Sequence, residues 1–202
     1  MTEGTTAGAA VRVDSQPLSV LSRSPPPTSL ALGDRAVEFS ALEGVDGVRY
    51  SLEQFRDAAV VVLMFTGNAC PAAKGCMAQV VAFQEAFGTR GVKVVGIDSN
   101  NPYLSPEDTM EGMVRTAATY RLNFPFLKDP EGRVARQFGA VNTPHFLVLD
   151  QERRLRYRGR MFDSREPERA TTHDLHDAVV SLLEGRPVAL PETKPLGCSI
   201  VW

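Results

Sequence analysis

The stretch Val60-Val-Val-Leu-Met-Phe-Thr-Gly-Asn-Ala-Cys70-Pro-Ala-Ala-Lys-Gly-Cys76 decides the fold of this chain. An apolar, β-branched run over residues 60–65 is typical of a buried strand, and a turn of small residues follows it. Cys70 then stands at the start of a predicted helix, where the helix dipole and unpaired N–H groups favour the thiolate. We interpret Cys70 as a candidate redox centre, the alternative being a small buried hydrophobic residue.

The composition is that of a globular protein with one domain of ordinary size. The 202 residues are 43% hydrophobic and 23% charged, and the net charge is −2. Because acids and bases are interspersed, nucleic acid is not an expected partner. No apolar run approaches the ~20 residues of a membrane span, and the N-terminus lacks the basic start of a secretory signal. Three cysteines are too few for a disulfide scaffold, so the expected localisation is cytoplasmic.

The sequence divides into three parts. Residues 1–29 are rich in Thr, Ser, Gly, Ala and Pro, which predicts a flexible N-terminal lead-in. Residues 30–187 carry the periodic segments of a folded domain. Residues 188–202 contain prolines but no helical period, and they end in Ile-Val-Trp. We expect an extended C-terminal tail docked on the domain, because an exposed tryptophan is unusual.

Strands and helices alternate along the predicted domain. The expected strands are residues 37–42, 60–65, 92–97, 124–127, 145–149 and 154–160. The expected helices are residues 50–55 with Ser51 as cap, 70–88, 105–120, 133–138, and a last one from Thr171 or Thr172 to 183. Alternating βαβ units require parallel strands with helices on both faces, and the closing hairpin adds antiparallel strands. The predicted fold class is therefore α/β, a central mixed sheet flanked by helices on both faces.

Several segments together resemble a known family. A strand leading to Cys70 at a helix start, with Thr143-Pro144 just before a distant strand hairpin, resembles the thioredoxin fold. A more specific resemblance, to the peroxiredoxin-like (redoxin, alkyl hydroperoxide reductase/thiol-specific antioxidant) subgroup, rests on Leu32-Gly-Asp34, Phe65-Thr-Gly-Asn-Ala-Cys-Pro71, Thr143-Pro-His-Phe146, Tyr157-Arg-Gly-Arg160, Thr172-His-Asp-Leu175 and Pro191-Glu-Thr-Lys-Pro-Leu-Gly-Cys-Ser-Ile-Val-Trp202. The resemblance implies a cis Pro144 beside the thiol, with backbone there that recognises substrate. The alternative is a trans proline, because only about 5–6% of such bonds are cis.

Two motifs of the better-understood relatives are incomplete here. A dithiol oxidoreductase uses Cys-x-x-Cys, whereas Cys70-Pro-Ala-Ala73 and Gly67-Asn-Ala-Cys70 each contain one cysteine. Peroxiredoxins use Pro-x-x-x-Thr/Ser-x-x-Cys, and here Leu63 and Gly67 stand at the proline and hydroxyl positions. These departures argue against a local dithiol cycle and against efficient peroxidase chemistry. The arginine of the peroxiredoxin site is not assignable, and Arg158 and Arg160 are candidates in name alone.

The other two cysteines have different expected roles. Cys76 follows Cys70 by six residues, about 240° around an ideal helix, which favours a buried core thiol over a partner. Cys198 lies in the tail. If the tail docks near the Cys70 helix, Cys198 could attack an oxidised Cys70 and close a long-range disulfide. An inert Cys198 in a structural tail remains the alternative.

No metal site or cofactor is expected. His173 and His176 share a helix face, but no second cluster supplies the further ligands that zinc needs. The polar loop over residues 98–108 lacks the glycine and the final glutamate of a calcium-binding EF-hand.

The leading prediction is a thiol-based redox protein, a thiol–disulfide oxidoreductase or antioxidant, with Cys70 and Cys198 as its catalytic residues. Residues that shape the thiol loop or contact substrate are predicted to be Asn68, Pro71, Thr143, Pro144 and His145. The expected partners are a thiol or disulfide substrate and, for reduction, a low-molecular-weight thiol or a partner reductase. The contrasting hypothesis is a catalytically silent binding module that keeps the fold. The oligomeric state stays open.

Overall fold

The computed structural model describes residues 30–202 together with Met1, so the predicted lead-in lies, apart from Met1, outside the described residues. A seven-stranded sheet forms the centre, in the order β2-β1-β5-β4-β3-β7-β8. The three inner strands β5, β4 and β3 are parallel, whereas β1, β2, β7 and β8 join by antiparallel pairing. The strands of this sheet are β1 (Leu42–Gly44), β2 (Arg49–Tyr50), β3 (Val60–Thr66), β4 (Val92–Asp98), β5 (Phe126–Lys128), β7 (His145–Leu149) and β8 (Leu155–Gly159).

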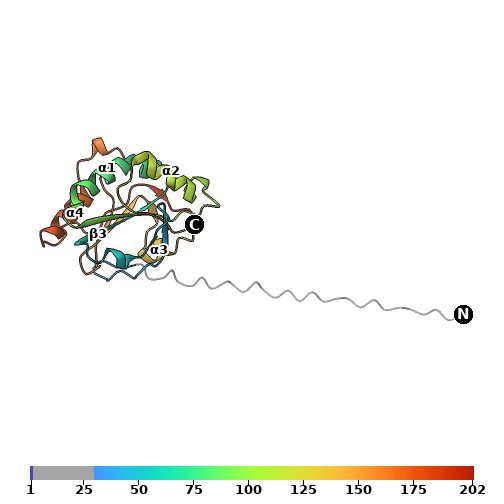
Figure 1. The fold of residues 1–202 in the computed structure, drawn as a ribbon, viewed down its shortest axis with the longest axis horizontal. Coiled ribbons are helices and arrows are strands. Elements are labelled where there is room, and N and C mark those ends of the chain that lie inside the picture. Colours follow the sequence, from blue (N-terminus) through green and yellow to red (C-terminus); the bar gives the residue numbers. More distant parts are fainter. Residues whose placement is uncertain (2–29) are drawn as a thin grey trace.

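Helices cover both faces of this sheet, as predicted for an α/β fold. Figure 1 shows α1, α2 and α4 on one side of the sheet and α3 on the other. The α-helices are α1 (Pro71–Gly88), α2 (Met110–Tyr120), α3 (Arg133–Phe138) and α4 (Asp174–Leu183). Three short 3₁₀ helices complete the described part of the chain: η1 (Leu52–Phe55), η2 (Pro106–Asp108) and η3 (Pro167–Arg169).

Strand β3 lies between two hydrophobic cores, which explains its unbroken apolar sequence. All seven of its residues are buried. Alternate side chains point to opposite faces: Val61, Leu63 and Phe65 join the core under α3, and Val60, Val62 and Met64 join the core under α1 and α4. The predicted strand over 60–65 is confirmed, and β3 ends at Thr66, four residues before Cys70.

Several element boundaries differ from those predicted. Residues 37–41 are not a strand, because Ala41 adopts a left-handed φ of 56° and β1 begins at Leu42. The helix predicted over 105–120 is interrupted at Thr109, whose extended backbone (φ −74°, ψ 163°) separates η2 from α2. The Thr109 hydroxyl accepts the N–H of Gly112 at 3.3 Å and so caps α2.

The predicted start of the last helix is also wrong. Thr171 and Thr172 donate their backbone N–H groups to Asp163 Oδ1, at 2.8 and 3.1 Å, and they remain in the preceding loop. The N-cap residue of α4 is His173. By contrast, the short helix η1 follows Ser51 as predicted, and Gln54 Oε1 accepts the Ser51 N–H at 2.7 Å.

The C-terminal residues form a second, two-stranded sheet that the sequence did not predict. Strand β9 (Cys198–Ser199) pairs antiparallel with β6 (Asn142–Thr143). Ile200 follows, is 4% exposed and joins the core under α3. The tail thereby crosses the end of the sheet where β3 leads into α1.

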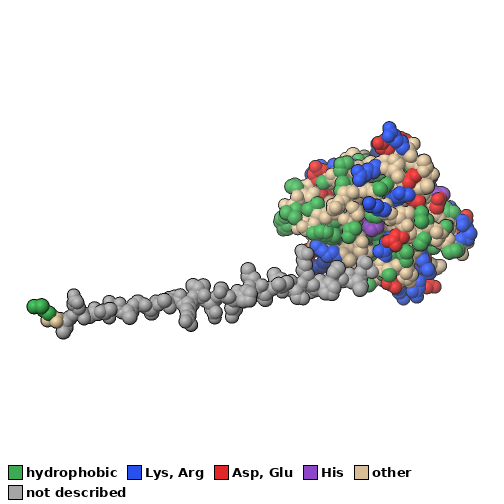
Figure 2. Space-filling model, turned by 180° about the vertical axis from the view of Figure 1, so that it is seen from behind, with side chains coloured by type: hydrophobic (Ala, Val, Ile, Leu, Met, Phe, Trp, Pro, Cys, Tyr) green, Lys and Arg blue, Asp and Glu red, His purple; other side chains and the backbone are tan. Residues whose placement is uncertain are grey.

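The surface of the protein mixes both signs of charge. Figure 2 shows basic and acidic side chains interspersed over one face of the molecule. Among residues 30–202, no helix is both long enough and apolar enough to cross a membrane.

Candidate thiol site

Cys70 is the N-cap residue of α1. Its backbone is extended (φ −82°, ψ 115°), and its Sγ accepts the N–H of Ala73 at 3.4 Å. Pro71 occupies the first helical position, where a missing N–H costs nothing because that group has no partner within the helix. The Cys70 residue is 3% exposed. The predicted placement of the thiol at a helix start is confirmed.

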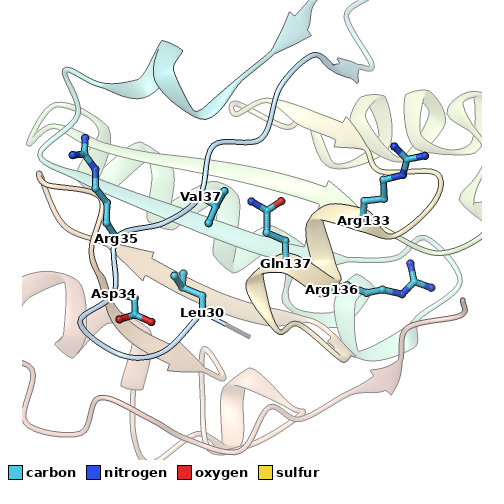
Figure 3. A pocket seen from close by; sticks show the side chains of 7 residues that line it. All are labelled: Leu30, Asp34, Arg35, Val37, Arg133, Arg136 and Gln137. Carbon is cyan, nitrogen blue, oxygen red and sulfur yellow. The ribbon is translucent and has the colours of Figure 1, made fainter. Parts of the chain in front are cut away.

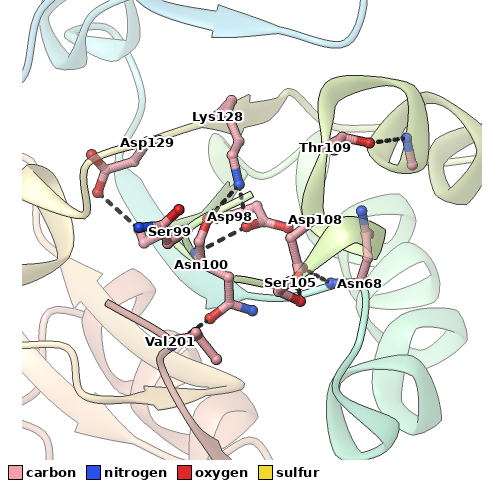
Figure 4. A network of polar contacts seen from close by, with 12 residues as sticks. Asn68, Asp98, Ser99, Asn100, Ser105, Asp108, Thr109, Lys128, Asp129 and Val201 are labelled. Carbon is pink, nitrogen blue, oxygen red and sulfur yellow. Dashed lines mark hydrogen bonds and ion pairs between the residues drawn. The ribbon is translucent and has the colours of Figure 1, made fainter. Parts of the chain in front are cut away.

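The loop before Cys70 is held by the 3₁₀ helix η2. Asp108 Oδ1 accepts the backbone N–H of Asn68 at 2.5 Å (Figure 4). The Asn68 side chain donates to Glu107 O at 2.9 Å. Ser105 Oγ donates to the other Asp108 oxygen. Asn68, 4% exposed, therefore fixes the thiol loop and offers almost no surface to a dissolved substrate.

Gly67 shows why the peroxiredoxin hydroxyl is absent from this loop. A Cβ on Gly67 would lie 2.2 Å from Asn100 Nδ2 and 3.3 Å from Asp108 Oδ1. The place of a threonine side chain is thus filled by Asn100. Thr66, one residue earlier, is 1% exposed, and its hydroxyl has no hydrogen-bond partner among the described residues.

The Thr143–Pro144 peptide bond is cis, as the resemblance implied. Cys70 Sγ lies 2.9 Å from the Thr143 carbonyl oxygen, which accepts a hydrogen bond from the Cys70 thiol when that thiol is protonated. Both residues are buried. The chain before the hairpin is thus in direct contact with the candidate thiol, 73 residues away in sequence.

The structure brings Cys198 to Cys70. Strand pairing places Cys198 opposite Thr143, and the two Sγ atoms are 2.8 Å apart. This distance exceeds the ~2.05 Å of a disulfide bond, and both residues are free cysteines. Cys198 is exposed, whereas Cys70 is buried. The sequence left the contact between these two residues open, and the tail's pairing with β6 provides it.

The two thiols have unlike acidities. Burial by itself raises the pKa of Cys70, but hydrogen bonds, the strongest from the Cys198 thiol, outweigh burial and lower this pKa below its usual value. For Cys198, burial and then the hydrogen bond and charge of Cys70 raise the pKa. Cys70 is therefore the more acidic thiol of the pair, and Cys198 keeps its proton to a higher pH than Cys70. Thiol–disulfide exchange uses such a pair: one thiolate attacks a disulfide, and a neighbouring thiol then resolves the mixed disulfide that forms.

Cys76 and His145 lie apart from this pair. Cys76 is in the core under α1 and α4, donates to Ala73 O at 3.4 Å, and has its pKa raised to about 12 by burial. His145 is 4% exposed, and neither ring nitrogen has a hydrogen-bond partner among the described residues. Burial, and next the charge of Arg158, lowers the pKa of His145 to about 4, so the ring is neutral near pH 7. A side chain so enclosed has almost no surface for a dissolved substrate.

A buried polar network, which the sequence did not reveal, connects the thiol loop to the tail (Figure 4). Lys128 Nζ donates to Asp98 Oδ1 at 2.8 Å and to Asn100 O at 2.7 Å. Burial raises the pKa of Asp98 well above its usual value. Burial also acts to raise the pKa of Asp108, but hydrogen bonds, first from Asp98, lower it. Asp108 is therefore the more acidic of these two carboxyl groups.

At its other end, this network contacts the backbone of the C-terminal tail. Val201 N–H donates to Asn100 Oδ1 at 2.8 Å, and Val201 O accepts the N–H of Asn101 at 2.7 Å. Beyond it, the guanidinium of Arg136 stacks over the Trp202 ring at 4.1 Å. A Cβ on Gly132 would lie 2.5 Å from the same ring, which shows how closely the ring covers α3's first turn. The terminal aromatic residue predicted that the tail docks, but no local pattern indicated these partners.

Other features of the described residues lie outside this site. A cavity of about 710 Å³ on the α3 side contains none of the predicted site residues. Its lining residues, drawn in Figure 3, are Leu30, Asp34, Arg35, Val37, Arg133, Arg136 and Gln137. Arg158 donates to Leu30 O, and Arg160 forms an ion pair with Asp174 at 2.6 Å. Within residues 30–202, no group of three or more His, Cys, Asp or Glu residues is placed to hold a metal ion.

Comparisons with known proteins agree with this architecture. The solved structure of an uncharacterised conserved protein from Geobacillus kaustophilus has a TM-score of 0.81 and 35% identity, and the match covers 87% of this chain and 94% of that one. The thioredoxin domain of a thiol-disulfide oxidoreductase from Bacteroides vulgatus has a TM-score of 0.54 at 18% identity, over 63% of this chain and 86% of that one. At that identity the similarity shows the thioredoxin fold alone.

Sequence comparison identifies the family. The Mycobacterium tuberculosis protein Rv2521, named provisionally as a peroxiredoxin, is 32% identical over 120 residues, which are 56% of this chain and 66% of that protein. The chain thus spans just under two thirds of that relative's length. The profile of the AhpC/TSA family matches residues 32–158, more than half of the chain and all of β1 to β7. The protein belongs to the AhpC/TSA family of the thioredoxin superfamily.

Proposed function

We propose that this protein is a thiol redox enzyme in which Cys70 is the nucleophile and Cys198 is the resolving thiol. The observation that carries the proposal is the 2.8 Å separation of the two Sγ atoms. The lowered pKa of Cys70 and the raised pKa of Cys198 assign the roles. Family membership supports thiol-based chemistry, and the tail supplies the second cysteine that the Cys70-Pro-Ala-Ala73 motif lacks.

The proposed cycle begins with an oxidant that carries a hydroperoxide or a disulfide. With a hydroperoxide, the Cys70 thiolate attacks the terminal oxygen, the alcohol leaves, and a sulfenic acid forms. The Cys198 thiol then attacks that sulfur, a Cys70–Cys198 disulfide forms, and water leaves. With a small disulfide, Cys70 forms a mixed disulfide and releases one thiol, and Cys198 displaces the second thiol. Both routes remove two electrons and two protons from the pair.

Reduction of the pair requires an external thiol. A partner dithiol reductase, or two molecules of a low-molecular-weight thiol, would attack the exposed sulfur of Cys198 and return both cysteines to the reduced form. Gly67 and Leu63 replace the two residues that support peroxide in the better-understood relatives, so disulfides are the favoured class of oxidant. Such a cycle fits the cytoplasm, where reduced thiols are maintained.

Intact-mass measurement after treatment with one equivalent of oxidant tests the proposal. We expect the wild-type protein to lose two hydrogens, with a Cys70–Cys198 peptide recovered after digestion and the mass restored by dithiothreitol. Cys70→Ser and Cys198→Ser should each abolish this product, whereas the matched control Cys76→Ser should keep it. If Cys70 stays reduced while a free thiol is oxidised under the same conditions, the catalytically silent binding module becomes the better account.

A further inference from the structure

The backbone of β6 is a strand edge that lies directly beside the nucleophile. Asn142 and Thr143 are extended, and the Thr143 carbonyl is 2.9 Å from Cys70 Sγ. An exposed strand edge binds extended peptides through its backbone N–H and C=O groups. A peptide that paired here with a cysteine opposite Thr143 would therefore present its sulfur to Cys70.

The protein's own tail already occupies this edge. Thr143 pairs with Cys198 and Asn142 with Ser199, and the Asn142 side chain donates to Cys198 O at 3.3 Å. The Cys198 sulfur sits 2.8 Å from Cys70 Sγ. The segment Gly197–Ser199 thus has the position and register that a cysteine-containing peptide substrate would need.

Contacts on both sides of Cys198 hold the tail in place. Before it, the Thr193 N–H donates to Arg158 O at 3.0 Å, and Gly197 touches β6 so closely that a Cβ on it would lie 2.0 Å from the Thr143 carbonyl oxygen. After it, Ile200 is 4% exposed and its N–H donates to Val141 O at 3.0 Å. An incoming polypeptide would have to displace these contacts.

The free space beside the docked tail is small. A cavity of about 20 Å³ lies between α1, the cis proline and the tail, lined among others by Ala72, Pro144 and Leu196. That is room for roughly one water-sized molecule. Cys70 itself is 3% exposed. A small oxidant needs a slight movement of the tail to reach the sulfur, whereas a polypeptide needs the whole edge of β6.

We infer that the C-terminal strand fills the place of a peptide substrate, so that the docked enzyme reacts with small oxidants and excludes disulfides carried by polypeptides. The inference rests on the proposed function, because it concerns which oxidants reach Cys70. It makes Gly197 a specificity-determining residue, since the missing side chain allows the tail to close on Thr143. The chemical steps are those of the small-disulfide route above.

The test compares two disulfides that share one leaving group and differ in size. The double variant Cys76→Ala/Cys198→Ser leaves Cys70 as the one thiol, because the chain has three cysteines. Release of thionitrobenzoate is followed with 5,5′-dithiobis(2-nitrobenzoate) and with a ten-residue peptide that carries the same thionitrobenzoate on a central cysteine. With the tail docked, we expect the peptide to react about tenfold or more slowly, because an open minor state holds at most about a tenth of the molecules.

Gly197→Ala, added to the same background, should release the tail and raise the peptide's rate by about tenfold or more, with a smaller change for the small disulfide. Gly75→Ala is the matched control, because its Cβ would meet Arg165 O at an ordinary 3.8 Å. We expect Gly75→Ala to leave both rates unchanged. The protein has one tryptophan, Trp202, and its fluorescence reports whether the tail has moved.

Two results would overturn the inference while leaving the thiol function intact. One is equal rates for both disulfides with the tail docked. The other is a changed Trp202 fluorescence in Gly197→Ala with an unchanged peptide rate. Ile200→Ala, which removes buried contacts of the tail, repeats the comparison if Gly197→Ala does not fold. If neither disulfide reacts with Cys70 in any variant, the proposed function fails and the inference fails with it.

Discussion

The candidate thiol site contains two cysteines whose pKa values are shifted in opposite directions. When Cys70 is ionised, its sulfur accepts the Ala73 N–H and the proton of the Cys198 thiol 2.8 Å away, so the negative charge is stabilised by one fixed donor and one movable donor. The fixed donor belongs to the helix and is present whatever the tail does. The movable donor exists only when the tail is docked. The acidity of Cys70 therefore depends on a residue near the end of the chain.

Replacing Cys198 by alanine should raise the pKa of Cys70, because the strongest of the hydrogen bonds that lower it comes from the Cys198 thiol. Serine at the same position keeps an O–H donor, so Cys198→Ser should raise the pKa less than Cys198→Ala. Thiolate absorbance, or the rate of alkylation at Cys70, measured against pH gives both values. An identical Cys70 pKa in the wild type and in Cys198→Ala would show that the tail thiol does not stabilise the thiolate.

At the scale of elements, strand β9 and the residues after it act as a cover over α1's first turn. This cover depends on Trp202, since the Trp202 ring packs against Gly132 and the Arg136 guanidinium stacks over it. A cation–π contact at a partly exposed site contributes about 0.5–1 kcal/mol. Because Cys70 is 3% exposed, a reagent reaches it when this cover opens.

Trp202→Ala should therefore make Cys70 more reactive. Loss of about 1 kcal/mol of docking energy raises the open fraction about fivefold. In a Cys198→Ser background, the alkylation rate of Cys70 by iodoacetamide should rise by about the same factor. Trp202→Phe keeps an aromatic face over Arg136 and should change the rate much less. An unchanged rate in Trp202→Ala would mean that the cover does not open at its C-terminal end.

How far the sequence predicts these elements depends on the range of the interactions. Strand β3, helix α1 and its capping Cys70 follow from local signals, namely a buried apolar run, small residues and a proline at the first helical turn. The pairing of β6 with β9 has no such signal, because two-residue strands show no periodicity and Asn142 lies 56 residues from Cys198. The bond from Asn68 to Asp108, 40 residues apart, is hidden for the same reason.

At the scale of the whole molecule, the thiol site depends on parts of the chain that are far apart. Asp108 fixes the thiol loop, and Asn100 fixes the tail. Asp98 connects the two, because its side chain is hydrogen-bonded to Asp108 and to Lys128, whose Nζ also donates to the Asn100 carbonyl oxygen. Each of these groups is buried, so removing one partner leaves another unsatisfied in a region of low dielectric. The network therefore fixes the thiol loop that leads to Cys70 relative to the tail that carries Cys198.

The pH dependence of stability should reveal another buried group, His145 on β7. Burial lowers its pKa in the folded protein to about 4, from about 6.5 in the unfolded chain. Between these values the unfolded chain binds more protons than the folded protein, so the unfolding free energy falls as pH decreases from about 6.5 to about 4, by about 3 kcal/mol from this residue.

Replacing His145 by leucine should remove this part of the pH dependence, measured by urea unfolding at several pH values. His176→Gln, at an exposed position, is the control and should keep it. If His145→Leu shows the same loss of stability toward pH 4 as the wild type, the ring is protonated in the folded protein, and β7 must then open to solvent beside the cis proline.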